Sequence, residues 1–88
     1  MKFRLNKQVE KDLRRIDNRK LFIQFREFLK EVGEASSLND LSGIKKIKGE
    51  RVYFRYRLGD YRVGFKIEDN EILILKVAHR KDIYRYFP

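Results

Sequence analysis

The chain has 88 residues, which is enough for one domain and too short for two, because a chain of this size buries only about 60% of the surface that it exposes when unfolded. Hydrophobic residues make up 42%, no stretch approaches the ~18 apolar residues of a membrane span, and no apolar signal segment opens the chain. Cysteine is absent, which excludes disulfides and thiolate metal sites. We therefore expect residues 1–88 to form a single cytoplasmic domain.

Charge is the most informative feature of the composition. The chain carries 22 Lys and Arg against 13 Asp and Glu, a net charge of +9. Residues 1–40 contain ten basic and seven acidic side chains, whereas residues 41–88 contain twelve and six. Such an excess favours nucleic acid, an anionic membrane surface or an acidic protein as the partner and does not by itself distinguish them. A merely solubilising surface remains an alternative on charge alone.

The first half of the chain has the pattern of a short strand and two helices. Residues 1–5 can form the strand, and Asn6 is a suitable N-cap for a helix with Val9 at its first buried turn. Asp17 and Asn18 interrupt this helix and begin the next, which Gly33 should end. The apolar stripes predict an αα-hairpin, and they comprise Val9, Leu13 and Ile16, then Leu21, Phe22, Phe25, Phe28, Leu29 and Val32.

The second half changes to the period of two that is typical of strands. Residues 52–58 and 61–67 alternate apolar with polar side chains, and the Gly59-Asp60 pair between them predicts a two-residue hairpin. Asp69-Asn70 predicts a second hairpin, leading to residues 72–78, which are apolar on both faces and should be an interior strand. The fold class is therefore α+β, with the short strand and helical hairpin packed on a small, mainly antiparallel, twisted sheet.

A two-residue turn fixes which residues face one another in the first hairpin. Arg57 should face Arg62, and Arg55 should face Gly64, on the side opposite the apolar residues. Like charges opposite each other disfavour folding, whereas guanidinium groups side by side suit a phosphate. We expect Gly64 to leave this face open to a nucleic-acid backbone. A solvated face with arginines lying over aromatic rings is the alternative.

Other cations flank this hairpin. A basic run precedes it, and the C-terminal segment interleaves cations with rings that could stack on unpaired bases, as Arg80, Tyr84, Arg85 and Tyr86 show. The side chains that we expect to bind RNA or the ribosome are Lys45, Lys46, Lys48, Arg51, Arg57 and Arg85. His79 is the only histidine, and no cluster has metal-ligand spacing, so we expect no metal and no cofactor.

The motifs "LSGIKKIKG", "YRLGDYRVGF" and "VAHRKDIYRYF", following a helical hairpin, resemble the RelE branch of the RelE/ParE toxin superfamily over nearly the whole chain. This resemblance implies a type II toxin, a ribosome-dependent endoribonuclease that cuts mRNA in the ribosomal A site and is held inactive by an acidic antitoxin of the RelB or a related family. It implies catalytic roles for Arg55, Arg62, Arg80 and Tyr84: phosphate binding by Arg62, activation or charge stabilisation by Arg55, leaving-group assistance by Arg80, and nucleotide stacking by Tyr84.

Some relatives have two lysines where this strand has Tyr53 and Arg55. Because arginine is a poor general base, the resemblance does not identify the proton acceptor. Two other functions stay open: a ParE-like inhibitor of DNA gyrase, and a non-catalytic module that binds RNA or the ribosome.

Overall fold

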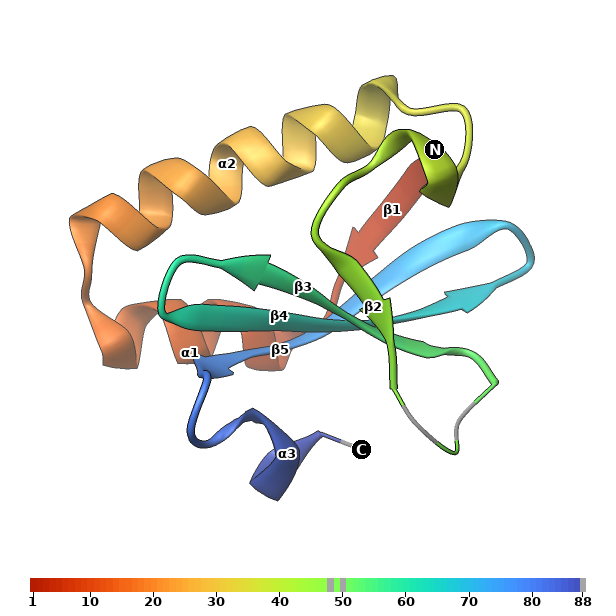
Figure 1. Ribbon diagram of the computed structural model, residues 1–88. Helices are drawn as coiled ribbons and strands as arrows, with labels where there is room; N and C mark the ends of the chain where they lie inside the picture. The colour runs from red at the N-terminus through yellow and green to blue at the C-terminus, as the bar shows by residue number, and fades with distance from the viewer. Residues whose placement is uncertain (48, 50, 88) are drawn as a thin grey trace.

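The computed structural model describes residues 1–47, 49 and 51–87. The elements follow in the order β1 (Lys2–Leu5), α1 (Lys7–Ile16), α2 (Arg19–Glu34), a 3-10 turn (Leu38–Asp40), β2 (Ile44–Lys46), β3 (Tyr53–Leu58), β4 (Tyr61–Glu68), β5 (Glu71–His79) and α3 (Ile83–Tyr86), as Figure 1 shows. The strands form a 5-stranded sheet in the order β1-β5-β4-β3-β2, with β1 parallel to β5 and the other pairs antiparallel. The expected α+β fold is confirmed.

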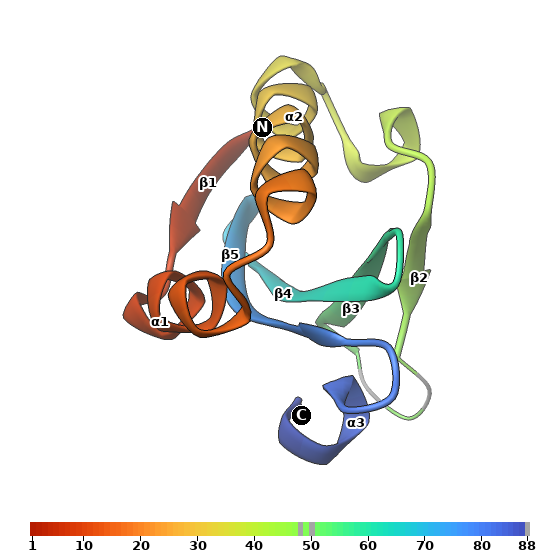
Figure 2. The ribbon, with the colours of Figure 1, turned by 90° about the vertical axis from the view of Figure 1, so that its left-hand side faces the viewer.

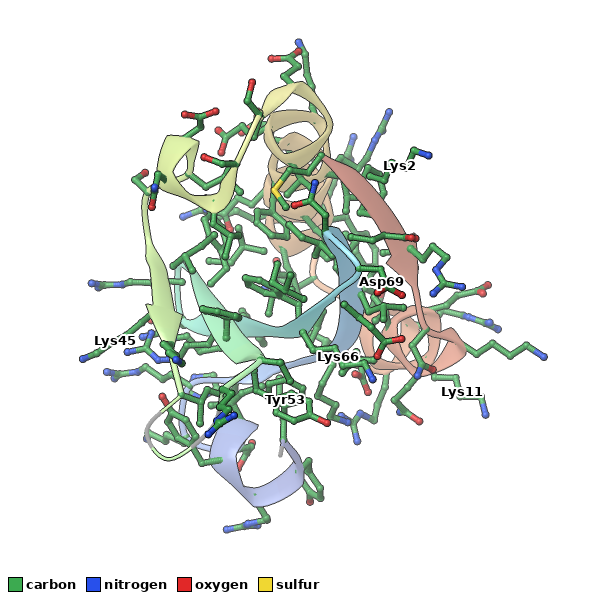
Figure 3. All side chains as sticks on the ribbon, turned by 90° about the vertical axis from the view of Figure 1, so that its right-hand side faces the viewer. Lys2, Lys11, Lys45, Tyr53, Lys66 and Asp69 are labelled. Atoms are coloured by element: carbon green, nitrogen blue, oxygen red, sulfur yellow. The ribbon has the colours of Figure 1, made fainter. Side chains whose placement is uncertain are left out.

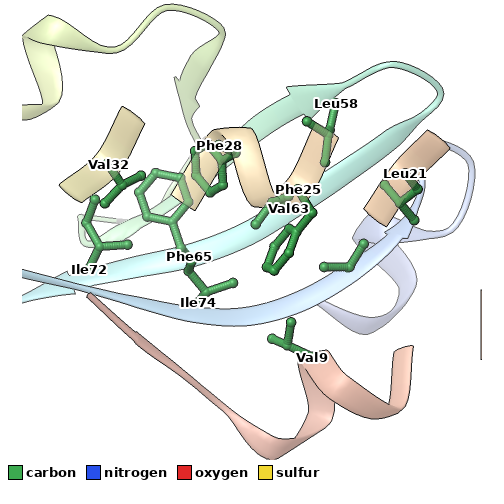
Figure 4. Close-up of a cluster of buried hydrophobic side chains, with 11 residues drawn as sticks. Val9, Leu21, Phe25, Phe28, Val32, Leu58, Val63, Phe65, Ile72 and Ile74 are labelled. Atoms are coloured by element: carbon green, nitrogen blue, oxygen red, sulfur yellow. The ribbon is translucent and has the colours of Figure 1, made fainter. Parts of the chain in front are cut away.

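The sheet curves around α2, and α3 lies on the opposite side of it (Figure 2). Helix α2 supplies the apolar stripe that the sequence predicts, and this stripe packs on β4 and β5 (Figure 4). The core consists of Val9, Leu21, Phe25, Phe28, Val32, Leu58, Val63, Phe65, Ile72, Ile74 and Val77, each at most 6% exposed. Because α2 packs on one face of the sheet, the opposite face of the sheet is available for α3 and for polar side chains.

Side-chain caps set the boundaries of the first two helices. The Asn6 side chain accepts a hydrogen bond from the backbone N–H of Gln8 (2.9 Å), and the Asn18 side chain accepts one from Leu21 (3.0 Å). Asp17, between the helices, has a left-handed φ of 49°. The expected interruption at Asp17 and Asn18 is thus confirmed, and each of the two consecutive helices packs chiefly on the sheet.

The prediction that Gly33 ends α2 is wrong, because the helix continues to Glu34. The N-terminal ammonium of Met1 donates to the carbonyl of Val32 (2.8 Å) and to that of Ala35. The positive charge of this ammonium lies at the negative end of the helix and satisfies carbonyl groups there, a role that a left-handed glycine cap fills in many other helices.

Helix α1 lies beside β5, where β1 has ended, and it closes this edge with a buried carboxylate. The Asp12 side chain is fully buried and accepts hydrogen bonds from the backbone N–H of Val77, the Lys76 ammonium and the Gln8 amide, each at 2.9 Å. It therefore replaces the partner strand that Val77 lacks on that side.

The two tight turns match the sequence. Gly59 has a φ of 63° and Asp60 does not have a positive φ, as in a type II′ turn, whereas Asp69 (52°) and Asn70 (59°) both have positive φ, as in type I′. None of the helices in the described part of the chain is long and apolar enough to cross a membrane.

Candidate functional site

Three arginines share the face of the β3–β4 hairpin that points away from the core. Arg57 pairs with Arg62 and Arg55 with Gly64, the register that the sequence predicts. Side chains alternate between the two faces of a strand, and the neighbouring Leu58 and Val63 are buried in the core. Arg55, Arg57 and Arg62 therefore project together from the opposite face.

The end of the chain adds Arg80 and Tyr84 to this face. The backbone N–H of Arg80 donates to the carbonyl of Asp60 (2.8 Å), which attaches the end of β5 to the hairpin turn. Partial burial is the main cause that lowers the pKa of Arg62, and the charges of Arg55, Arg57 and Arg80 lower this pKa further, while Tyr84 acts in the opposite direction. Because such effects fall with distance, these four side chains lie around Arg62. We call Arg55, Arg57, Arg62 and Arg80 the arginine cluster.

Among the described residues, the arginine cluster has no carboxylate partner. Arg62 donates through Nη1 to the carbonyls of Gly59 and Tyr61, both at 2.8 Å, so backbone dipoles orient it without neutralising it. Within residues 1–47, 49 and 51–87, no Asp or Glu lies within 4.0 Å of a guanidinium nitrogen of the cluster. An anion bound here would relieve the mutual repulsion of the arginines and accept planar, bidentate hydrogen bonds from them.

The expectation that Gly64 leaves the face open is wrong, because the ring of Phe87 covers it. A Cβ atom at position 64 would lie 2.5 Å from Cδ2 of Phe87. Phe87 is 5% exposed and meets the Tyr53 ring edge-on, with ring centroids 5.6 Å apart. Tyr53 projects from β3 toward α3 in Figure 3. The apolar spacing of Ile83 and Phe87, four residues apart, is the sequence signal that could have shown this packing.

Comparisons with known proteins identify the family of this chain. The sequence model of the family described as "ParE toxin of type II toxin-antitoxin system, parDE" matches residues 3–84. Toxin RelE3 of Methanocaldococcus jannaschii is 39% identical over the full length of both chains. The chain belongs to the RelE/ParE toxin superfamily. Its fold also matches two toxins of the RelE branch, in crystal structures of the RelB-RelE antitoxin-toxin complex from Methanococcus jannaschii (TM-score 0.80, 36% identity, 96% of this chain and 98% of that one) and of the archaeal RelE-RelB complex from Pyrococcus horikoshii (TM-score 0.70, 30% identity, 90% and 93%).

The other cations of this RelE-like toxin are distributed more widely than the arginine cluster. Lys45 on the edge strand β2 pairs with Arg55 and extends outward (Figure 3), so it prolongs the cationic face. Lys46 pairs with Phe54 and so points to the other side of the sheet. Arg51 is exposed in the bend before β3, and the predicted contact of Lys48 lies outside the described residues.

Arg85 and His79 lie at a pocket that is separate from the arginine cluster. Arg85 lines it together with Arg15 and His79, and no member of the arginine cluster does. The His79 ring meets Tyr61 edge-on at 5.5 Å, and its Nδ1 accepts from the backbone N–H of Lys81 (3.2 Å). His79 thus has a packing role. In the described part of the toxin, no three His, Asp or Glu side chains are grouped as metal ligands would be.

Proposed function

We propose that this toxin is an endoribonuclease that cleaves mRNA in the A site of the ribosome. The observation that supports this proposal is the arginine cluster, which surrounds Arg62 with like charges and offers no carboxylate among the described residues. Folding alone disfavours such a grouping, and a phosphodiester favours it.

In the proposed reaction, the RNA 2′-oxygen attacks the adjacent phosphorus and the bond to the 5′-oxygen breaks. The 2′-hydroxyl loses a proton, the 5′-oxygen gains one, and the products are a 2′,3′-cyclic phosphate and a 5′-hydroxyl. Arg62 would hold the phosphate, Arg55 would stabilise charge on the attacking side, and Arg80 would assist the leaving oxygen. Tyr84, 59% exposed beside them, would stack on a base at the cleavage site.

Guanidinium groups supply all the charge stabilisation in this reaction, which is therefore proposed to be metal-independent. One oriented donor to a developing negative charge contributes about 3–4 kcal/mol. The cluster contains no histidine or carboxylate to move protons, so we expect free RNA to be cut poorly and the ribosome to contribute by shaping the substrate.

The flanking cations would contact the RNA and ribosomal phosphates around the cleavage site. Lys45 and Arg57 extend the cationic face itself. Lys46, Arg51 and Arg85 would add contacts farther out, and we propose an RNA contact for Lys48 as well. This class of contact contributes affinity that falls as salt rises, because bound counterions are released.

Arg62→Ala, with Arg26→Ala as its matched control, tests the proposal. Arg26 is exposed on α2, so both variants lose one positive charge but only Arg62 belongs to the cluster. Primer extension on a translated message should show cleavage by wild type and Arg26→Ala, and a rate lower by about 10²–10³-fold for Arg62→Ala. Full cleavage by a folded Arg62→Ala variant, with folding checked by circular dichroism, would contradict the assigned role.

We also propose that a cognate acidic antitoxin of the RelB or a related family inhibits this toxin. The two archaeal RelE-type proteins that match it were crystallised with RelB. An amphipathic acidic chain would neutralise part of the +9 charge and cover exposed apolar side chains such as Ile23 on α2 and Leu5 on β1. Co-expression of the neighbouring gene should abolish toxicity; persistent toxicity would argue against that gene product as the antitoxin.

The name of the matched family supports testing a second function, inhibition of DNA gyrase. The higher-identity relatives are RelE proteins, and a cationic cluster with Tyr84 suits RNA better than a protein target. We therefore expect no effect of the purified toxin in a DNA supercoiling assay. A toxin that binds ribosomes without producing cleaved ends in primer extension would instead be a binding module.

A further inference from the structure

The position of Tyr84 depends on a contact that none of the residues assigned above provides. Helix α3 is a single turn, from Ile83 to Tyr86, and a helix this short has no stability of its own, since isolated helices shorter than ~12–15 residues are marginal in water. Side-chain packing must therefore hold this turn against the sheet.

That packing is a small apolar cluster, separate from the main core, on the same face as the arginine cluster. Ile83 is fully buried, Phe87 is 5% exposed and Ala78 is 4% exposed. The half-buried side chains around them are Ile47, Tyr53 and Leu75. Ile83 and Phe87 anchor the two ends of the segment, and Tyr84, one residue after the first anchor, stays 59% exposed beside the cationic face.

The second of these buried side chains, Phe87, packs on Gly64, and we call the backbone of β4 at Gly64 the seat of the Phe87 ring. A Cβ atom built there would lie 2.5 Å from Cδ2, 2.7 Å from Cε2 and 2.7 Å from Cγ of Phe87, so the aromatic ring rests directly on the backbone of β4. Any side chain at position 64 would force the ring or the strand to move. Gly64 also pairs with Arg55, so the seat lies next to the cationic side chains of the hairpin.

We infer that Phe87 is a positioning residue, whose ring on Gly64 holds the last turn so that Tyr84 stays exposed beside the arginine cluster. The inference rests on the proposed function, because it concerns how the same site is assembled. Phe87 itself is almost completely buried, so it acts through Tyr84 and not on RNA.

The test is a double-mutant cycle in the ribosome-dependent cleavage assay, with Phe87→Ala, Tyr84→Ala and the combined variant. We expect each single variant to lower kcat by roughly 5- to 150-fold, the range that a base–aromatic stack contributes. The combined variant should be within about twofold of Tyr84→Ala, since additivity fails for residues that act together. Losses that multiply, or a wild-type rate for Phe87→Ala, would overturn the inference.

A second pair of variants reports on the seat independently of activity. Gly64→Ala introduces the clash, and Gly33→Ala is its matched control, because Gly33 is exposed, lacks a positive φ, and a Cβ there meets only Phe3 at 3.9 Å. Hydrogen exchange of the Arg85 amide, which donates to the carbonyl of Asp82 (3.0 Å), should accelerate in Gly64→Ala and Phe87→Ala, and stay at the wild-type rate in Gly33→Ala. Unchanged protection in the first two would show that Phe87 does not hold the turn.

These outcomes separate the inference from the proposed function. If the wild-type toxin does not cleave translated mRNA, the proposed function fails and the positioning role fails with it. If wild type and Gly33→Ala cleave, and Phe87→Ala cleaves equally well, only the positioning role fails.

Discussion

Replacing Asp12 by alanine should be among the most destabilising single changes in this protein. The Asp12 carboxylate is fully buried and accepts hydrogen bonds from three donors: the backbone N–H of Val77, the ammonium of Lys76 and the side-chain amide of Gln8. The substitution removes all three hydrogen bonds together. It also leaves Lys76, whose side chain is 11% exposed, without the anion that lies 2.9 Å from its ammonium.

The magnitude follows from these losses. A buried N–H without an acceptor costs about 1–3 kcal/mol, and removal of one partner from a buried ion pair typically costs about 3–5 kcal/mol in all. The Tyr86 ring, 5.1 Å from the Lys76 ammonium, compensates only in part, since cation–π contacts contribute about 0.5–2 kcal/mol. We therefore expect a loss of about 3 kcal/mol, a large fraction of the ~5–15 kcal/mol by which domains are stable.

Urea unfolding followed by circular dichroism measures this loss, with Glu10→Ala as the matched control on the same helix. Glu10 pairs with Arg14 at 3.0 Å, but their side chains are 74% and 72% exposed, so its removal should cost less than about 0.5 kcal/mol. An Asp12→Ala, Lys76→Met double variant should recover much of the loss, because an apolar pair needs no counter-charge. A loss for Asp12→Ala no greater than that of Glu10→Ala would refute the reasoning.

Three other changes have expected outcomes. Acetylation of the Met1 amine removes the positive charge at the end of α2 and should lower the free energy of unfolding by about 1 kcal/mol in urea titrations; an unchanged value would show that this cap is dispensable. Arg57→Thr removes a like charge opposite Arg62 and should raise stability by about 0.2–1 kcal/mol while weakening RNA binding; equal or tighter RNA binding in a salt titration would speak against the phosphate site. Burial, and then the charge of Glu31, raise the pKa of Tyr56, so its contribution to stability is complete below about pH 10 and is lost as pH rises through the folded-state pKa. As pH rises above about 10, the free energy of unfolding should therefore fall less for Tyr56→Phe than for wild type. An equal fall in both proteins would contradict this.

The parts of the fold that the sequence predicts well are those set by local chemistry. Asn6 and Asn18 are caps because their side chains reach the next backbone N–H groups, and Gly59-Asp60 fixes the hairpin register because a two-residue turn allows one pairing. The end of α2 could not be predicted in this way. It depends on the N-terminal ammonium, which approaches from a residue 31 positions earlier in the chain.

The site shows the same division. The shared face of Arg55, Arg57 and Arg62 follows from strand alternation and register alone. The role of Gly64 does not, because what covers it is decided by Phe87, 23 positions later, and no local pattern connects the two. The Asp12–Lys76 pair could be predicted only in part. A lysine within an apolar strand indicates that its ammonium needs a buried partner, but the sequence alone does not show that this partner is Asp12.

The two faces of the sheet therefore have different roles, since one carries the main core and the other carries the cationic site. The concave face carries nearly all the apolar packing, with α2 burying Phe25 and Phe28 against β4 and β5. The opposite face groups like charges that oppose folding, and it can do so because its stability comes from elsewhere: the first face, and the small cluster under α3. A cationic site on a face that contributes little to the core can change its arginines without loss of the fold. Conversely, a change at Asp12 or Phe28 should lower the stability of the whole fold, whereas a change at Arg62 should lower activity without lowering stability.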